Sequence, residues 1–320
     1  MTTRPRVGFV GPPTVLDAVR AALGDGIDTV GIPVDVAALR AALPALDGLV
    51  EATTRLPLDA DAFASAPHLT IVSIAGTGDA HVDRAAAANH GVDVRSLVED
   101  RELLETLNPT AEHTWGLLLA VIRHIAVASQ HVLGGGWERE QFPGMVLSGR
   151  RLGIIGLGRL GRKVARYGVA FGMDVVAADP ALTDDTTPEG VTPVDLDTLL
   201  ATSHVVSVHV PLDASTRGLL DRTRLDRMRH GAVLVNTSRG AVIDEQALAD
   251  AVRAGRLAGV ALDVLAEEPP AEDHPLLLLA REGAPVLVTP HLGGLVPEVL
   301  ESACVRAAEK VRERFEDGGR

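Results

Sequence analysis

The chain has 320 residues, of which 46% are hydrophobic and 23% are charged, and its formal net charge is −13. This length accommodates two domains, and the composition is that of a globular protein. The acidic balance argues against nonspecific binding to nucleic acids, because such binding depends on Lys and Arg contacts to phosphates.

The sequence carries no signal for a membrane or for a metal. Its apolar runs are far shorter than a bilayer-spanning helix requires, and the apolar start at residues 7–10 is too short for the core of a signal peptide. We therefore expect a cytoplasmic protein with no membrane partner. Cys304 is the only cysteine, which excludes an intrachain disulfide and a cysteine-based metal site, and its apolar-periodic surroundings predict a packed thiol.

In chain order, apolar runs typical of buried strands alternate with helical patterns such as the one at 14–23. The first series of strand-like runs covers residues 6–11, 28–32, 47–51 and 69–74. The second series covers residues 152–156, 174–179, 204–210, 232–236, 259–264 and 285–290. This alternation predicts an α/β protein with two Rossmann-like, doubly wound parallel-sheet domains and a cleft between them.

Two helical patterns lie outside these alternating series. Residues 108–128 predict a helix with Asn108 as its N-cap and Pro109 at its first position. Apolar residues cover most of its circumference, which predicts burial between domains or subunits. The pattern at 297–315 has no strand of its own, so this helix must pack on a unit that is already built.

Residues 156–161 read GLGRLG, a GxGxxG motif that directly follows a strand and opens a helix. Gly156 permits the tight turn, Gly158 lets the main chain approach a pyrophosphate, and Gly161 lets helix and strand pack closely. Arg159 and Leu160 complete the phosphate-facing turn. A close-packed turn without a ligand is the alternative, but the motif has the strand-then-helix context that dinucleotide binding requires.

Asp179 ends the next strand, 18 residues after Gly161. An acid at this place accepts hydrogen bonds from ribose hydroxyls and repels a 2′-phosphate. Asp184 and Asp185 follow it without an arginine, so the sequence predicts NAD rather than NADP as the cofactor.

Reactive side chains follow three later strands of the second series. Arg239 follows the run at 232–236, Asp263, Glu267 and Glu268 lie in and after the run at 259–264, and His291 follows the run at 285–290. A lone arginine or histidine at such a place is ordinarily a surface-loop residue. The carboxyl ends of parallel strands open on the crevice that receives the cofactor, so three such side chains predict a catalytic site.

This combination suits hydride transfer between a small acid and a nicotinamide. An arginine binds a carboxylate with two parallel hydrogen bonds and polarises a neighbouring carbonyl. A histidine removes or returns the hydroxyl proton, and a nearby glutamate favours its imidazolium form.

The chain resembles the D-isomer-specific 2-hydroxyacid dehydrogenases over nearly its whole length, and seven segments carry the resemblance. The segments are AGTGDAHVD (75–83), PTAEHTWGLLLAVIR (109–123), GIIGLGRLGRKVA (153–165), VHVPLDASTRGLLD (208–221), NTSRGAVIDE (236–245), ALDVLAEEP (261–269) and TPHLGG (289–294). The resemblance implies Arg239, Glu268 and His291 as the catalytic residues, and a small 2-hydroxy or 2-keto acid as the substrate.

The resemblance also implies the residues around the ligands. Asp263 falls on the nicotinamide side, Val210 and Pro211 lie along the cofactor, and Thr237 and Ser238 lie beside it. Further residues implied at the cofactor are Arg239, His291 and Gly294. The main-chain amides of Ala75, Gly76, Thr77 and Gly78, together with Arg239, are implied to hold the substrate carboxylate.

The same resemblance implies the organisation of the chain. Residues 1–107 with 295–320 would form the substrate domain, to which the C-terminal helix returns. Residues 108–294 would form the NAD-binding domain. A homodimer through the region 109–150 is expected.

The sequence departs from the family in ways that concern the substrate. The phosphoglycerate branch places arginines where this chain has Glu51 and Ile74. The missing cations, and repulsion by Glu51, argue against 3-phosphoglycerate. The segment 94–109 is longer than the usual link and lacks its Pro-Gly turn, so we expect it to alter the hinge or the rim of the pocket.

Three relatives of this fold offer alternative functions. Formate dehydrogenases pair the histidine with glutamine, so Glu268 speaks against them. Phosphite dehydrogenases keep the three catalytic residues and stay open as an alternative. An NAD-sensing interaction protein, similar to the corepressors that share the fold, is the alternative from another class, and turnover of 2-keto acids discriminates it.

Overall fold

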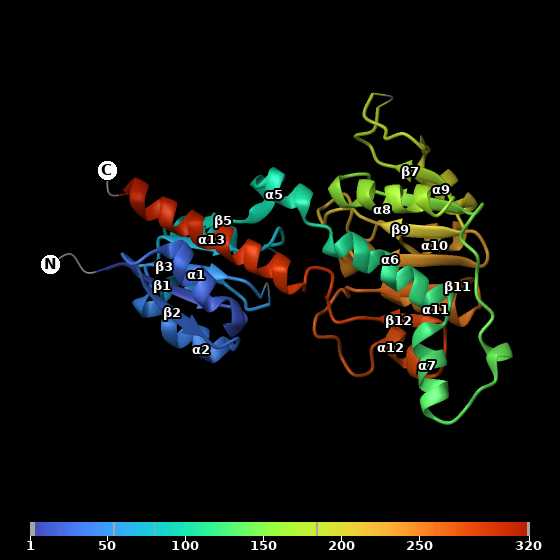
Figure 1. The fold of residues 1–320 in the computed structure, drawn as a ribbon, viewed down its shortest axis with the longest axis horizontal. Helices are drawn as coiled ribbons and strands as arrows, with labels where there is room; N and C mark the ends of the chain where they lie inside the picture. The colour runs from blue at the N-terminus through green and yellow to red at the C-terminus, as the bar shows by residue number, and fades with distance from the viewer. Residues whose placement is uncertain (1–3, 54, 80, 184, 319–320) are drawn as a thin grey trace. The chain divides into compact units, whose positions relative to one another are not determined.

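The structure is a computed structural model that describes residues 4–318 apart from Thr54, Ala80 and Asp184. The chain divides into two compact units, one formed by residues 1–107 with 295–320 and the other by residues 108–294 (Figure 1). Both units are built on fully parallel sheets, so the predicted α/β class with two parallel-sheet domains is confirmed.

The first unit has a five-stranded sheet in the order β2-β1-β3-β4-β5. Its strands are β1 (Arg6–Val10), β2 (Asp28–Ile32), β3 (Gly48–Glu51), β4 (Ile71–Ile74) and β5 (Asp93–Arg95). Its α-helices are α1 (Leu16–Leu23), α2 (Val36–Ala42), α3 (Ala60–Ala64), α4 (Arg84–Asn89), α5 (Arg101–Thr106) and α13 (Pro297–Gly318), with short 3-10 turns at Pro13–Val15, Leu43–Ala45 and Leu97–Glu99.

Alternate residues of these strands point to opposite faces, and each face has its own apolar core. On one face, Val7 and Phe9 of β1 pack with residues of α1 and α13, where Cys304 is fully buried as predicted. On the other face, β1, β3 and β4 pack with α2, α3 and α4. The orphan helix α13 therefore completes one face of the first sheet, where Figure 1 shows it in red beside the blue strands.

The long segment 94–109 attaches to α13 in the first unit. Leu97 and Leu104 form a small apolar cluster with Ala303. Between them, the carboxylate of Asp100 accepts a hydrogen bond from Nε of Arg306 at 2.7 Å and forms an ion pair with the buried Lys310. These charged groups hold the pKa of Asp100 below its usual value, although its partial burial opposes this.

The second unit has a seven-stranded sheet in the order β12-β11-β10-β9-β6-β7-β8. Its strands are β6 (Arg151–Ile155), β7 (Asp174–Ala178), β8 (Val191–Pro193), β9 (Val205–Val208), β10 (Ala232–Asn236), β11 (Leu257–Leu262) and β12 (Val286–Val288). Its α-helices are α6 (Pro109–Ile122), α7 (Ile125–Leu133), α8 (Arg159–Ala170), α9 (Leu196–Thr202), α10 (Arg222–Arg227), α11 (Glu245–Arg253) and α12 (Pro275–Arg281), with 3-10 turns at Arg139–Gln141 and Gly240–Val242.

The helix expected over 108–128 is broken, which corrects that prediction. His124 adopts a left-handed conformation with φ of 54°, so α6 ends at Ile122 and α7 begins at Ile125. The side chain of Asn108 makes no capping hydrogen bond, although Pro109 does occupy the first turn. Helix α6 is largely buried against β10, β11 and α8, whereas no residue of α7 is buried within the described unit.

Among the described ranges, no single helix is both long and apolar enough to cross a bilayer. The stretch Arg101–Ile122 reaches the necessary length and composition only together with Ile125–Leu133, across a bend of 59°.

We predict that Asp100→Ala lowers the free energy of unfolding of the first unit by about 3 kcal/mol, because it leaves the buried Lys310 without its counter-charge. Urea denaturation measures this loss. The neighbouring Glu99→Ala removes an exposed carboxylate and serves as the matched control. Equal midpoints for the two variants would show that the Asp100 pairs contribute nothing.

Candidate active site

The glycine motif turns from β6 into α8 with the geometry that a dinucleotide needs. Gly156 has φ of +87°, in the left-handed region that favours glycine. A Cβ at Gly161 would overlap the carbonyl oxygen of Gly156, so only glycine permits this close packing. Gly158 is the N-cap of α8 and a Cβ there would meet nothing, which leaves the helix N-terminus open to a phosphate.

Arg159 and Leu160 form the first turn of α8, and both are partly buried. Unsatisfied N–H groups at a helix N-terminus attract the negative charge of a pyrophosphate. The residues of this turn therefore fit NAD on their own geometry.

Asp179 joins the end of β7 to the glycine turn. Its Oδ2 accepts a hydrogen bond from the amide of Leu157 at 2.7 Å, and its Oδ1 accepts one from the amide of Ala181 at 2.8 Å. A carboxylate oxygen has two lone pairs, so these bonds leave acceptor capacity for ribose hydroxyls. Of the two acids that follow in sequence, Asp184 lies outside the described residues, and Asp185 is exposed.

The segment after β9 lies against the same glycine turn. A Cβ on Gly156 would come within 2.8 Å of both the carbonyl oxygen of His209 and Cγ1 of Val210. Pro211 follows and is exposed. Burial lowers the pKa of His209 to about 4, and its Nε2 lies 2.8 Å from Oγ of Ser207. Although the residue as a whole is partly exposed, its Nδ1 is buried without a partner among the described groups.

The loop after β10 is shaped by the buried side chain of Asn236. Its Oδ1 accepts hydrogen bonds from the amide and the hydroxyl of Ser238, at 2.9 and 2.8 Å, and its Nδ2 donates to the carbonyl of Arg239 at 3.0 Å. The hydroxyl of Thr237 bonds that of Thr114 in α6 at 2.7 Å. Arg239 is partly exposed, and its Nη1 donates to the carbonyl of Ser238 at 2.6 Å.

Gly240 brings this loop against the one that follows β11. A Cβ at Gly240 would overlap the main chain of Leu265 and Ala266, so the two loops meet through backbone. Glu245 fixes the second loop by accepting a hydrogen bond from the amide of Ala266 at 2.8 Å. Arg239 and Glu268 are thereby carried on adjoining loops.

Glu268 and His291 form a direct pair. Nδ1 of His291 lies 2.7 Å from Oε2 of Glu268, and the amide of Leu265 donates to Oε1 at 3.0 Å. Partial burial acts to raise the pKa of Glu268, but the hydrogen bonds and the charges of His291 and Arg239 outweigh it and lower the pKa. Glu268 is therefore anionic at neutral pH. The three predicted catalytic side chains lie together at the ends of neighbouring strands.

Asp263 holds the main chain around His291 in place. Its carboxylate is buried and accepts hydrogen bonds from the amides of Leu292 and Gly293, both at 2.7 Å, and from the hydroxyl of Thr289 at 2.6 Å. Nε2 of His113 lies 3.1 Å from the same carboxylate. These contacts explain how His291, a non-glycine residue, holds φ of 57°.

Sequence reasoning places Asp263 on the nicotinamide side by resemblance, and in the structure its carboxylate also bonds to the protein around His291. It missed His113 and Thr114 of α6, which reach Asp263 and Thr237, and it missed Asn236. A polar histidine-threonine pair inside an otherwise apolar helix was the available signal. Gly294 follows this bonded segment and is exposed.

The loop at 75–78 belongs to the first unit and follows β4. Thr77 is exposed, and Ala75, Gly76 and Gly78 are partly exposed. Among the described residues, none accepts a hydrogen bond from the amides of Gly76, Thr77 or Gly78. Three successive amides with unused donors suit an anionic ligand such as a carboxylate.

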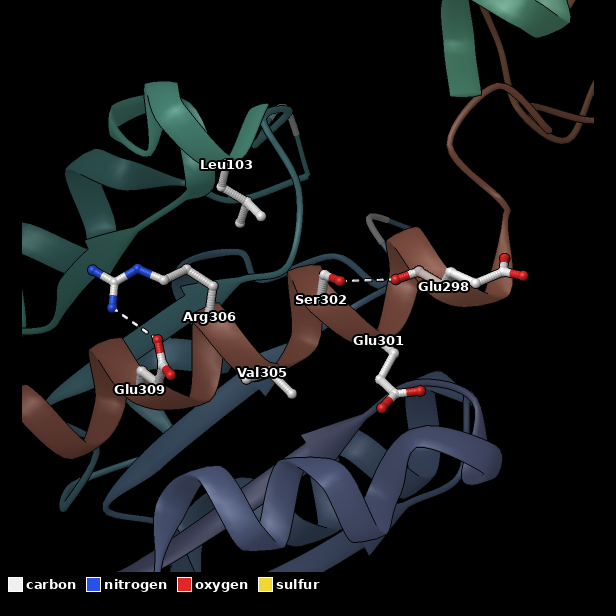
Figure 2. A pocket seen from close by; sticks show the side chains of 7 residues that line it. All are labelled: Leu103, Glu298, Glu301, Ser302, Val305, Arg306 and Glu309. Atoms are coloured by element: carbon white, nitrogen blue, oxygen red, sulfur yellow. Dashed lines mark hydrogen bonds and ion pairs between the residues drawn. The ribbon is translucent and has the colours of Figure 1, made fainter. Parts of the chain in front are cut away.

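An open hollow of about 560 Å³ lies elsewhere in the first unit, along α13 (Figure 2). It is lined by Leu103, Glu298, Glu301, Ser302, Val305, Arg306 and Glu309. Arg306, the only cation of this lining, already pairs with Asp100, Glu309 and Glu313. None of the residues that the sequence predicts as functional lines this hollow.

The D-isomer specific 2-hydroxyacid dehydrogenase NAD-binding domain matches residues 115–293, more than half of the chain. The chain belongs to this family. The matched domain is an NAD-binding domain, so NAD is the cofactor, as predicted.

Two relatives show how far the likeness extends. The chain is 36% identical to a hydroxypyruvate reductase of Thermotoga maritima over 84% of this chain and 85% of that protein. It is 38% identical to a D-3-phosphoglycerate dehydrogenase of Archaeoglobus fulgidus over 79% of this chain. The match spans only 47% of that dehydrogenase, about half of its length.

A solved structure extends the likeness to the fold. The D-lactate dehydrogenase of Aquifex aeolicus, complexed with NAD and lactic acid, superposes with a TM-score of 0.83 at 26% identity. The match covers 98% of this chain and 96% of that one. The family fold thus extends over both units.

We predict that Asp179→Ala relaxes discrimination against NADPH and also raises KM for NADH, because the carboxylate braces the amide of Leu157 in the glycine turn. Steady-state kinetics with both cofactors measure the two effects. Asp185→Ala removes an exposed acid nearby and serves as the control. An unaltered NADH to NADPH preference would remove Asp179 from the ribose site.

We predict that His209 makes the second unit less stable as the pH falls from 6.5 to about 4. Its pKa is depressed on folding, so the unfolded chain takes up the proton first, and stability present above pH 6.5 is lost as the pH falls through the folded pKa. The loss is roughly 3 kcal/mol at about 1.36 kcal/mol per pKa unit.

Urea denaturation of wild type and His209→Gln at several pH values measures this term. The difference between their unfolding free energies should shift across this pH window, while the exposed His230→Gln tracks the wild type throughout. Parallel profiles for wild type and His209→Gln would contradict a buried, neutral His209.

Proposed function

We propose that the protein is an NAD-dependent dehydrogenase that interconverts a small D-2-hydroxy acid and its 2-keto acid. The observation that carries this proposal is the 2.7 Å contact of His291 with the anionic Glu268, beside Arg239 and at the strand ends of an NAD-binding unit. One fold can host many functions, so the proposed function depends on these three side chains.

Each side chain has a distinct part in the proposed reaction. The guanidinium of Arg239 binds the substrate carboxylate and polarises the adjacent carbonyl. Glu268 accepts the N–H at Nδ1 of His291, which fixes the ring and leaves Nε2 to take or return the hydroxyl proton. The glycine turn of residues 156–161 and Asp179 would hold NAD, which would supply the hydride acceptor for oxidation and, as NADH, the hydride donor for reduction.

The loop at 75–78 is the proposed second anchor for the substrate carboxylate. Its support is the set of free amide donors at Gly76, Thr77 and Gly78 among the described residues. Main-chain amides can bind one carboxylate, but they carry no positive charge to compensate a further anionic group. This loop therefore favours a small monocarboxylate over a polyanionic acid.

The expected repulsion of phosphoglycerate by Glu51 is wrong. Glu51 is fully buried and engaged with His81 and Thr53, so its charge is compensated inside the protein rather than presented to a substrate. A phosphate would still lack a cationic partner, because Glu51 and Ile74 stand where the phosphoglycerate branch has arginines. On that basis we propose a substrate without a phosphate, with phosphohydroxypyruvate as the second candidate because matched relatives bear the name phosphoglycerate dehydrogenase.

We propose a homodimer that buries the exposed apolar side chains of the region 109–150. This region carries several large hydrophobic side chains that are about half or more exposed within one chain: Ile125, Val127, Val132, Leu133, Trp137 and Val146. Large apolar side chains left exposed in this number within one region support an interaction surface there. Light scattering of the purified protein, with Leu133→Glu as the disrupting variant, tests the assembly.

NADH oxidation with a panel of 2-keto acids tests the proposed function. The panel includes glyoxylate, pyruvate, hydroxypyruvate, phosphohydroxypyruvate and longer apolar acids. Turnover of unphosphorylated acids supports the proposal, and a preference for phosphohydroxypyruvate selects the second candidate. NADH binding without reduction of any acid would favour a sensor of the nicotinamide pool.

We predict that His291→Ala lowers kcat for the best keto acid by about 10²–10⁴-fold, the usual contribution of a general acid or base. KM for NADH should stay within about twofold of wild type, because the glycine turn is untouched. Stopped-flow or steady-state kinetics measure both constants, with the exposed His230→Ala as the control. An unchanged kcat would remove His291 from proton transfer.

A further inference from the structure

The loop that follows β4 is held at both of its ends by a single residue. The carbonyl oxygen of Glu51, the last residue of β3, accepts a hydrogen bond from the amide of Ala75 at 2.7 Å, where the loop begins. The carboxylate of the same residue lies 3.0 Å from Nε2 of His81, six positions further along the chain. Glu51 thus spans the segment that carries the free amides of Gly76, Thr77 and Gly78.

This carboxylate is a buried charge with a complete set of partners. Glu51 is 0% exposed, and the side chain of His81 is 8% exposed. Its Oε1 accepts hydrogen bonds from the amide of Thr53, at 2.8 Å, and from the hydroxyl of Thr53, while Oε2 faces His81. Burial acts to raise the pKa of Glu51, but the hydrogen bond and charge of His81 and the bonds from Thr53 outweigh it, so the pKa is lowered.

Other contacts hold the loop without involving its free amides. The carbonyl of Gly76 accepts a hydrogen bond from the amide of Leu97, in the long segment 94–109, at 2.9 Å. The carbonyl of His81 accepts one from the amide of Leu58, also at 2.9 Å. The carbonyls of Gly76 and His81 therefore hold the loop, while the amides of Gly76, Thr77 and Gly78 donate to no described residue.

We propose that the Glu51–His81 pair is a positioning device that sets the shape of the loop at 75–78 for binding the carboxylate of an unphosphorylated 2-keto acid. This inference rests on the proposed function, because it assigns the ligand of the loop amides. Neither side chain contacts the substrate. Both act through the loop, whose amides must converge on two carboxylate oxygens.

The charges of the Glu51–His81 pair also favour a substrate without a phosphate. The carboxylate at the end of β3 is buried and pairs with Nε2 of His81. Ile74, at the adjacent end of β4, is buried and apolar. The named residues at these two strand ends thus offer a substrate amide donors and no positive charge, which suits a single carboxylate and not an added phosphate.

His81→Ala, Glu51→Gln and the double variant test the proposal by kinetics on the full-length protein. His81→Ala should raise KM for the best keto acid ten- to hundredfold, while KM for NADH stays within about twofold. Glu51→Gln keeps an acceptor of the same size for His81 and should raise KM for the keto acid less. The double variant removes the buried charge together with its partner, so it tests the loop even where His81→Ala alone does not fold.

Arg20→Gln is the matched control, because it breaks the exposed Arg20–Asp17 ion pair of α1 in the same unit, which shares no residue with the contacts that hold the loop. Its kinetic constants should equal those of wild type. A folded His81→Ala or double variant with an unchanged KM for the keto acid would overturn the proposal, provided that the wild type turns over that acid.

A wild type that reduces no keto acid would overturn the proposed function instead. The positioning role is then tested by hydrogen exchange of the amides of Leu58 and Leu97, which donate to the carbonyls of His81 and Gly76 in the loop. The double variant should accelerate their exchange at least tenfold, and Arg20→Gln should leave it unchanged. Equal exchange in the wild type and the double variant would refute the positioning role as well.

Discussion

The buried carboxylate of Asp263 is the constraint on which the geometry of the catalytic unit depends. It gathers the amides of Leu292 and Gly293 and the hydroxyl of Thr289 at distances of 2.6–2.7 Å. A buried carboxylate that lost these donors would be strongly destabilising, so the bonds fix the chain on both sides of His291. The left-handed backbone of His291 is thereby stabilised by a group that never needs to touch the substrate.

Both units use the same arrangement, in which an inward carboxylate shapes an exposed loop. Asp263 holds the loop of His291, and Glu51 holds the loop at 75–78. In each case the oxygens of the acid satisfy main-chain or imidazole N–H groups inside the protein. The functional groups on the other side of the loop stay free for ligands, which separates support from chemistry.

The sequence predicted the strands with long apolar runs, the glycine turn and the family, because these depend on local patterns and on motif spacing. It missed β5 and β8, which are three residues long and lie at sheet edges with little apolar signal. It also missed the break at His124, since a left-handed residue leaves no mark in hydrophobic periodicity. The inward orientation of Glu51 depends on a partner 30 positions away, so no local pattern could reveal it.

The placement of α13 gives the two units different routes to the folded state. The second unit is built from one continuous stretch of chain, so its core can close as soon as residues 108–294 are available. The apolar face of the first sheet that includes Val7, Phe9 and Val50 is covered by residues such as Ala307 and Val311, some 260 to 300 positions later. During synthesis that face stays open while the rest of the chain emerges, which makes it the surface most in need of protection from aggregation.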